Sequence, residues 1–134
     1  MGQPPMWQAG WYRHARALAS PNVGARPAQT EVDLVVIHAI SLPPGEYGGP
    51  HVQSLFTNQL DHHLHPYFES LKDLKVSAHF YIQRGGELWQ FASCDDRAWH
   101  AGESMHLGRP QCNDFSIGIE LEGLDGDVFT DAQY

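Results

Sequence analysis

The sequence predicts a single domain of the α/β class, and three observations lead to this prediction. The chain has 134 residues, a length typical of one domain and too short for two. A nearly continuous β-branched and aliphatic run over residues 32–40 predicts a strand buried on both faces, at the centre of a sheet covered by helices. Segments with helical spacing follow this run, as expected when strands and helices alternate.

Composition and charge exclude several classes of protein. Hydrophobic residues make up 42% of the chain and aromatic residues 11%, enough for one packed core and too much for a disordered chain. The chain has 8 Lys and Arg against 16 Asp and Glu, a net charge of −8, which disfavours binding to nucleic acid or to an anionic membrane. The 9 histidines favour metal chemistry, since histidine is the commonest metal ligand.

Cysteine usage and the N-terminus indicate a cytoplasmic protein. Cys94 and Cys112 lie in no zinc-finger spacing and are too few for a disulfide framework, so two reduced thiols are expected. No apolar run approaches the ~20 residues of a membrane span. The first 20 residues also lack the basic-then-apolar order of a signal peptide.

The order of elements is predicted from local signals. Residues 1–30 are rich in Pro, Ala and Gly, which favours an irregular arm, and residues 41–50 predict a long loop at the carboxyl end of the first strand. Val52, Leu55 and Phe56 have helical spacing, and Pro66 suits the first turn of a second helix. Residues 77–83 and 87–92 predict an antiparallel hairpin turning at a glycine pair.

The last strand and the end of the chain carry two further signals. Residues 115–122 alternate strictly, so that an apolar face is expected in the core and the opposite face carries two carboxylates. Thr130 and Gln133 form a capping box, which predicts the start of a helix. Because one helical turn is marginal by itself, we expect the sequence to be the amino-terminal portion of a longer protein, with its sheet core in residues 31–123.

Two residues are the leading candidates for chemistry. His38 ends the most hydrophobic strand just before the loop, where ligands bind in α/β sheets; a structural histidine is an equal alternative. Glu120 lies on the polar face of the last strand, with open space beside it at Gly118. Glu122 shares that face, so an acid/base pair of carboxylates is conceivable, although exposed carboxylates are the simpler interpretation.

Other histidines and one tryptophan are weaker candidates. The run of residues 61–65 contains His62, His63 and His65, but adjacent side chains diverge, so a solvated loop is favoured over a metal cluster. His79 is expected to be buried and hydrogen-bonded. Trp99 precedes a small-residue turn, where its ring could be a flat platform for a sugar or part of the core.

Several long segments resemble the zinc-dependent N-acetylmuramoyl-L-alanine amidases. These segments are LVVIH at residues 34–38, SLPPGEYGGP at 41–50, VSAHF at 76–80, RAWHAG at 97–102 and CNDFSIGIELEG at 112–123. The loop and the last strand are most similar to the cytoplasmic type that recycles anhydromuropeptides, the AmpD-like amidases. The resemblance covers essentially the whole chain.

The resemblance implies a mixed β-sheet flanked by helices, similar to peptidoglycan-recognition domains. It also implies one Zn²⁺ that supports hydrolysis of the amide between the lactyl group of anhydro-N-acetylmuramic acid and L-alanine. His38 matches the first zinc ligand and Glu120 the carboxylate that acts on water. Trp99, Ala98 and Lys75 are expected at the substrate wall, with His79 and His100 in support. The expected partner is a small muropeptide; oligomeric state is left open.

Two departures from the family qualify these expectations. Ala39 stands where close relatives have Asn. The family's second His ligand, its Asp ligand and its catalytic Lys match no position here, and catalytic zinc needs three protein ligands, so weak zinc binding is expected. Two alternatives stay open: a binding module for peptidoglycan fragments, and a zinc site built from other histidines, for which the placement of His62, His65 and His106 gives no support.

Overall fold

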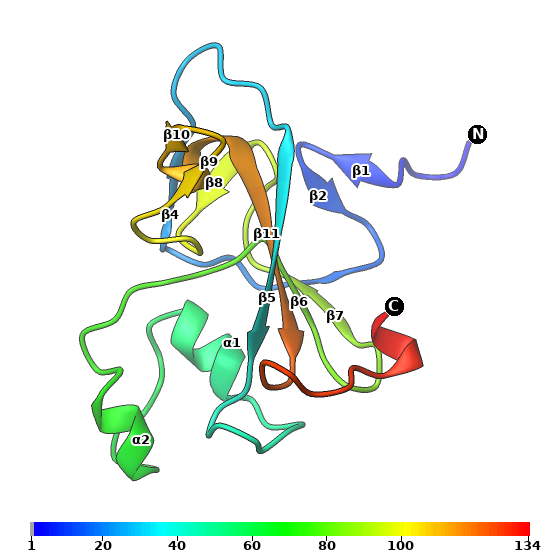
Figure 1. The fold of residues 1–134 in the computed structure, drawn as a ribbon. Coiled ribbons are helices and arrows are strands. Elements are labelled where there is room, and N and C mark those ends of the chain that lie inside the picture. The colour runs from blue at the N-terminus through cyan, green and yellow to red at the C-terminus, as the bar shows by residue number, and fades with distance from the viewer. Residues whose placement is uncertain (1) are drawn as a thin grey trace.

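The computed structural model describes residues 2–134, and its central feature is a five-stranded sheet (Figure 1). The strand order is β3-β7-β6-β11-β5. Their bounds are β3 Arg16–Ala17, β7 Leu88–Gln90, β6 Phe80–Ile82, β11 Ser116–Glu122 and β5 Leu34–Ile40. β11 runs parallel to β5 and β6, while β6 and β7 are antiparallel. The expected mixed sheet is confirmed.

Short strand pairs surround this sheet. They are β1 (Trp7–Gln8) with β2 (Trp11–Tyr12), β4 (Val23–Ala25) with β8 (Asp96–Ala98), and β9 (Met105–His106) with β10 (Arg109–Pro110). Three of these short strands, β1, β2 and β4, together with β3 of the main sheet, fall within residues 7–25, where the sequence predicts an irregular arm. Backbone pairing with β7 and β8 therefore orders much of that arm.

Both expected helices are present and short. α1 spans His51–Phe56 and α2 spans Pro66–Glu69, with Pro66 in the first turn as predicted. Two 3₁₀ turns follow later, η1 at Cys112–Phe115 and η2 at Asp131–Gln133. The capping box of Thr130 and Gln133 that begins η2 is also confirmed.

The main core lies where the helices meet the sheet. It consists of Leu42, Val52, Leu55, Phe56, Phe68, Ala78, Tyr81 and Phe91. Phe56 and Phe91 meet edge to face, with ring centroids 5.1 Å apart, which is a favoured aromatic geometry. The hairpin of β6 and β7 contributes Tyr81, and its turn contains Gly86 at φ +90°, as the glycine pair predicts.

One prediction about the sheet is wrong: β5 is an edge strand rather than the centre. β11 occupies the middle position and pairs with β5 on one side and β6 on the other. Among residues 2–134 no strand pairs with the second edge of β5. Val35 and Ile37 are each 57% exposed, so the apolar run is covered on one face only.

The orientation of β11 also differs from the prediction. Ser116, Gly118, Glu120 and Glu122 face the protein interior, while the residues between them are half-buried. The polar face is buried because the His79 and His100 side chains pack against it. Both carboxylates are therefore held inside the protein, which is a costly arrangement unless they have partners or a function.

Candidate functional site

The candidate site is built on two neighbouring parallel strands. In the register of β5 and β11, His38 pairs with Glu120, so both side chains project from the same face of the sheet. His38 Nδ1 lies 4.0 Å from Glu120 Oε1. The two leading candidates from the sequence are thus brought together by the backbone ladder, although they are 82 residues apart in the chain.

Glu120 is a buried carboxyl group with an unused oxygen. It is 8% exposed, and its Oε2 atom has no hydrogen-bond partner. Burial raises the pKa of Glu120 to about 8, and the negative charge of Asp125 contributes to this shift. An unpartnered buried oxygen requires an explanation, and a bound cation, water or substrate group would supply one.

The ring of His38 has one nitrogen engaged and one available. Its Nε2 is 3.0 Å from Nδ1 of His100, and its Nδ1 faces Glu120. Burial lowers the pKa of His38, so the ring is neutral at pH 7. When Nε2–H donates to His100, the lone pair of Nδ1 is free to bind a metal ion, and a histidine ligand is typically oriented in this way.

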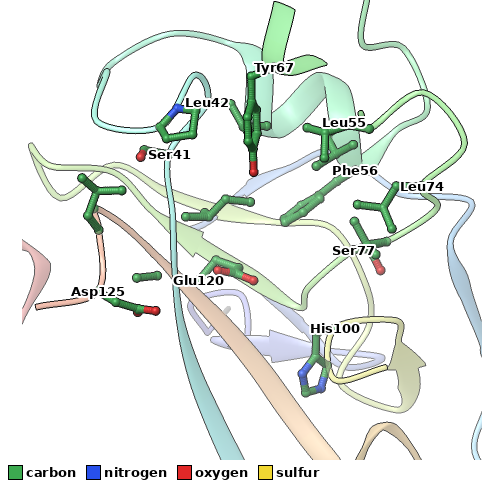
Figure 2. Close-up of a pocket in the computed structure, with 17 residues that line it drawn as sticks. Ser41, Leu42, Leu55, Phe56, Tyr67, Leu74, Ser77, His100, Glu120 and Asp125 are labelled. Atoms are coloured by element: carbon green, nitrogen blue, oxygen red, sulfur yellow. The ribbon is translucent and has the colours of Figure 1, made fainter. Parts of the chain in front are cut away.

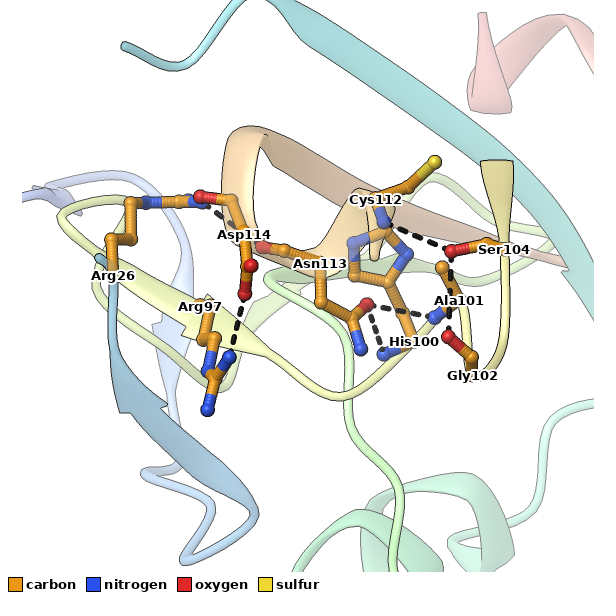
Figure 3. Close-up of polar contacts among 9 residues, drawn as sticks. All are labelled: Arg26, Arg97, His100, Ala101, Gly102, Ser104, Cys112, Asn113 and Asp114. Carbon is orange, nitrogen blue, oxygen red and sulfur yellow. Dashed lines mark hydrogen bonds and ion pairs between the residues drawn. The ribbon is translucent and has the colours of Figure 1, made fainter. Parts of the chain in front are cut away.

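His100, in the loop after β8, is held in place by Asn113 and Ser116, and Figure 3 shows the contacts of Asn113. The side-chain oxygen of Asn113 accepts hydrogen bonds from the backbone N–H groups of His100 and Ala101, at 3.1 and 2.9 Å. The Nε2 atom of His100 is 3.0 Å from the hydroxyl of Ser116. Burial, aided by the neighbouring His38, lowers the pKa of His100 to about 3, so this ring is neutral too.

His79 is buried and supports strand β11 through a hydrogen bond, as predicted. Its Nδ1 accepts from the backbone N–H of Gly118 at 3.0 Å, and its Nε2 is 2.8 Å from the carbonyl of Asp96. These partners set the tautomer with the proton on Nε2. Burial lowers the pKa of His79 to about 4; the bond to Asp96 opposes this shift and the charge of Arg26 adds to it.

A cavity of about 340 Å³ opens beside Glu120 (Figure 2). Apolar side chains from α1 and the segment after α2 line one side, and the ring of Tyr67 projects into it from α2. His100, Ser77 and Asp125 supply polar groups. Ala39, the departure from the family pattern, also lines this cavity. The combination of an apolar wall with a few polar groups is typical of a small-molecule site.

The structure separates the three expected substrate residues. Trp99 is half-buried next to His100, and its backbone N–H donates to the hydroxyl of Ser77 at 3.2 Å. Ala98 is completely buried in β8, so its methyl group is not open to a ligand. Lys75 is exposed and borders a different hollow, beside Leu71 and Leu74.

Glu122 shares the face of Glu120 but has a different environment. It is 3% exposed, and its two oxygens accept from the backbone N–H groups of Gly48 and Arg84, at 2.7 and 3.0 Å. Both oxygens are therefore occupied in holding loops. The conceivable acid/base pair of Glu120 and Glu122 is not supported by this geometry.

Sequence reasoning missed the direct contact between His38 and His100, as well as the role of Asn113. The sequence signal for Asn113 was weak, since an Asn before a strand has many uses. Cys94 and Cys112 are both free, in agreement with the expectation of reduced thiols. In residues 2–134 no helix is long and apolar enough to cross a membrane.

Comparisons with known proteins agree with the fold. Residues 28–134 match the family model described as N-acetylmuramoyl-L-alanine amidase. The chain is 54% identical over 125 residues to a curated protein of Citrobacter freundii, covering 93% of this chain and 67% of the relative. With an Escherichia coli K12 relative it shares 52% identity over 127 residues, covering 95% of this chain and 69% of that protein.

Solved structures of similar proteins have the same fold as this chain. A crystal structure titled as a selenomethionine AmpD derivative superposes with a TM-score of 0.92 at 53% identity, covering 95% of this chain and 71% of that one. The solution structure of Citrobacter freundii AmpD superposes with a TM-score of 0.62 at 52% identity, covering 96% and 68%. The chain belongs to the N-acetylmuramoyl-L-alanine amidase family. The curated relatives cited above are named 1,6-anhydro-N-acetylmuramyl-L-alanine amidase AmpD.

Proposed function

We propose that this chain carries a zinc-dependent amidase of cytoplasmic cell-wall recycling. The bond cleaved is the amide between the lactyl group of anhydro-N-acetylmuramic acid and L-alanine of a muropeptide. The observation that carries the proposal is the pairing of His38 with Glu120 at 4.0 Å beside an open cavity. The names of the relatives at 52–54% identity support the choice of substrate.

Glu120 is proposed as the general base. In its ionised form, which a cation bound nearby would favour over the neutral form that burial favours, the free Oε2 accepts a proton from water as the water oxygen attacks the lactyl carbonyl carbon. When the carbon–nitrogen bond breaks, the same proton passes to the departing amine of L-alanine. The amide is thereby replaced by a carboxylic acid and a free amine. A positioned base of this kind typically contributes about 10²–10⁴-fold to the rate.

His38 is proposed as one zinc ligand, through Nδ1. Zinc, when bound, lowers the pKa of water toward about 7 and polarises a carbonyl group. The residues fit in kind, because His38 offers a neutral imidazole as a ligand and the unpartnered oxygen of Glu120 is available to a water molecule. His38 is one of the three protein ligands that catalytic zinc requires, and within residues 2–134 no group of three ligating side chains includes it. The described donors therefore make up only part of a zinc site.

The cavity is proposed to receive the muropeptide. Its volume of about 340 Å³ lies within the usual range of roughly 300–1,000 Å³ for small-molecule sites. Trp99 and Lys75 remain proposed substrate contacts from the family resemblance, with the half-buried indole next to His100 the better placed of the two.

A second candidate function is the binding of peptidoglycan fragments without cleavage. The incomplete donor set around His38 favours it. A pure binding module has no use for a buried carboxyl group with a free oxygen, and such a group is expensive to maintain. The environment of Glu120 therefore favours the enzyme.

The test is hydrolysis of a 1,6-anhydro-N-acetylmuramoyl peptide in buffer containing Zn²⁺. The rate is measured from the release of the free stem peptide. Two forms should be compared: the 134-residue chain, and a form extended with the residues of the Citrobacter freundii relative that lie outside the matched segment. We expect Glu120→Gln to lower the rate of the active form by about 10²–10⁴-fold while peptide binding persists. His38→Ala should lower both zinc content and rate.

Two outcomes would contradict parts of this proposal. Near-normal hydrolysis by Glu120→Gln would mean that another group is the base. Binding of the peptide by both forms, with no cleavage by either when zinc is present, would establish the binding module instead. His106→Ala is the matched control, because His106 is exposed on β9.

A further inference from the structure

A second group of metal-ligating side chains lies outside the candidate site. The ligand atoms of His62, His63 and Glu69 all lie within 4.8 Å of one another. His62 is half-buried, and the other two residues are exposed. The group connects the loop before α2 with the end of α2 itself, on the helical side of the molecule (Figure 1).

A turn explains how two adjacent histidines come to face the same way. The Leu64 N–H donates to the carbonyl of Asp61 at 3.2 Å, and the His63 N–H donates to the Asp61 side chain at 3.0 Å. The two imidazole rings consequently lie with centroids 4.3 Å apart. The sequence argument that adjacent side chains diverge fails here, because the turn places both rings on one side.

Helix α2 supplies the third donor. Nδ1 of His65 caps this helix by accepting from the N–H of Tyr67 at 3.0 Å. This cap fixes where α2 begins, and Glu69, the last residue of the helix, then reaches the two rings. Lys72 Nζ is 3.9 Å from Glu69 Oε1, but such an exposed ion pair is worth only about 0–1 kcal/mol. A bound cation can therefore displace it.

The chemistry of these donors selects one class of ligand. Two imidazoles and one carboxylate suit Zn²⁺ and its neighbours among the transition metals, whereas Mg²⁺ and Ca²⁺ prefer oxygen ligands alone. Donors bound to one Zn²⁺ at ~2.0–2.1 Å stand roughly 3.3 Å apart in a tetrahedron. The ligand atoms therefore need to move closer by about 1.5 Å or less from a spacing within 4.8 Å, and the exposed His63 and Glu69 side chains can do so by rotating.

We propose that His62, His63 and Glu69 form a peripheral binding site for a divalent transition-metal ion such as Zn²⁺. The site is separate from His38 and does not depend on the proposed amidase function. An ion bound there ties the loop of residues 61–65 to α2. Because α2 carries Tyr67, whose ring projects into the cavity beside Glu120, the ion also limits the movement of that wall.

The experiment measures metal binding with His38 removed, so that the candidate catalytic site does not contribute. The His38→Ala chain is titrated with Co²⁺, followed by its visible absorption, and Zn²⁺ is then used to displace the Co²⁺. We expect one equivalent to bind. A further His62→Ala or His63→Ala substitution should weaken binding by at least about tenfold, since the loss of even an outer partner of a metal ligand typically has an effect of 10–100-fold.

Controls make the result specific. A Glu69→Gln substitution in the same background should also weaken binding, while His106→Ala should leave it unchanged. In the otherwise unmodified chain, Co²⁺ should broaden the imidazole NMR signals of His62 and His63 but not that of His106, which guards against misfolding of the His38 variant. Affinity that is insensitive to all three ligand substitutions, or an absence of binding at millimolar Co²⁺, would overturn the proposal.

Discussion

His38 Nε2 and His100 Nδ1 lie 3.0 Å apart, although one ring belongs to an edge strand and the other to the loop after β8. This contact leaves Nδ1 of His38 facing Glu120. Removing the second ring should release the first from its orientation. We expect His100→Ala to weaken zinc binding through His38 by about 10–100-fold.

Metal affinity at His38 can be measured by competition with a chromogenic chelator in a His62→Ala/His63→Ala background. His100→Gln offers a side-chain oxygen in place of Nδ1 and should recover part of the affinity. An affinity unchanged in both variants would mean that His100 has no part in orienting His38.

Glu120 and Glu122 should respond to the same substitution in opposite ways. Glu122→Gln replaces one of two oxygens that accept backbone N–H groups, so we expect a loss of about 2–3 kcal/mol in the free energy of unfolding. Glu120→Gln removes an ionisable group that burial already disfavours, and stability should be unchanged or higher. Urea unfolding at pH 7 measures the free energy of unfolding of each variant. Equal losses in the two variants would contradict the different environments assigned to Glu120 and Glu122.

Gly118 provides the space that His100 occupies. A Cβ atom at this position would lie 2.3 Å from Cγ of the His100 ring, so Gly118→Ala must displace the ring. We expect a loss of about 1–3 kcal/mol, as for other overpacked sites, together with the metal-binding defect of His100→Ala. The control is Gly49→Ala, whose Cβ would meet His51 at 3.4 Å. Denaturant titration of both variants checks the prediction.

His79 should make the protein sensitive to acid. Its pKa is lowered to about 4 in the folded protein, against about 6.5 in the unfolded chain. Between these values the unfolded chain binds more protons, so stability falls as the pH decreases through this window. We expect this residue to account for a loss of roughly 2 kcal/mol between pH 7 and pH 5.

The His79→Gln variant provides the comparison for that acid sensitivity. It should be less stable at pH 7, because a neutral hydrogen-bonding ring is lost, yet its stability should change less between pH 7 and pH 5. Thermal melts across that range measure both effects. An unchanged pH slope in the variant would assign the acid sensitivity to other groups.

Features encoded by neighbouring residues were predictable from the sequence. The glycine turn of the hairpin, Pro66 at the start of α2 and the capping box at Thr130 each depend on a few adjacent residues. His38 and Glu120 were predicted from position and from a family resemblance, and the structure brings the two side chains together.

Features that depend on distant segments were not predictable in the same way. The apolar run of β5 predicts a central strand. The order of strands depends on which elements pair, however, and it is β11 that lies between β5 and β6. Strict alternation in β11 shows that two faces differ without showing which one is buried. For the same reason, the side chains of His62 and His63 were expected to diverge until the turn at Asp61 was known.

The registration of β5 against β11 makes the candidate site intolerant of changes in chain length. Side chains alternate between the two faces of a strand, and His38 meets Glu120 only because the ladder runs unbroken from Leu34 to Ile40. Deleting one residue between Leu34 and His38 would leave either a locally distorted strand or a ring turned to the face where Val35 and Ile37 now lie. Substitutions at the exposed positions Val35 and Ile37 leave the pairing of His38 with Glu120 in place, whereas an insertion or deletion in β5 removes it.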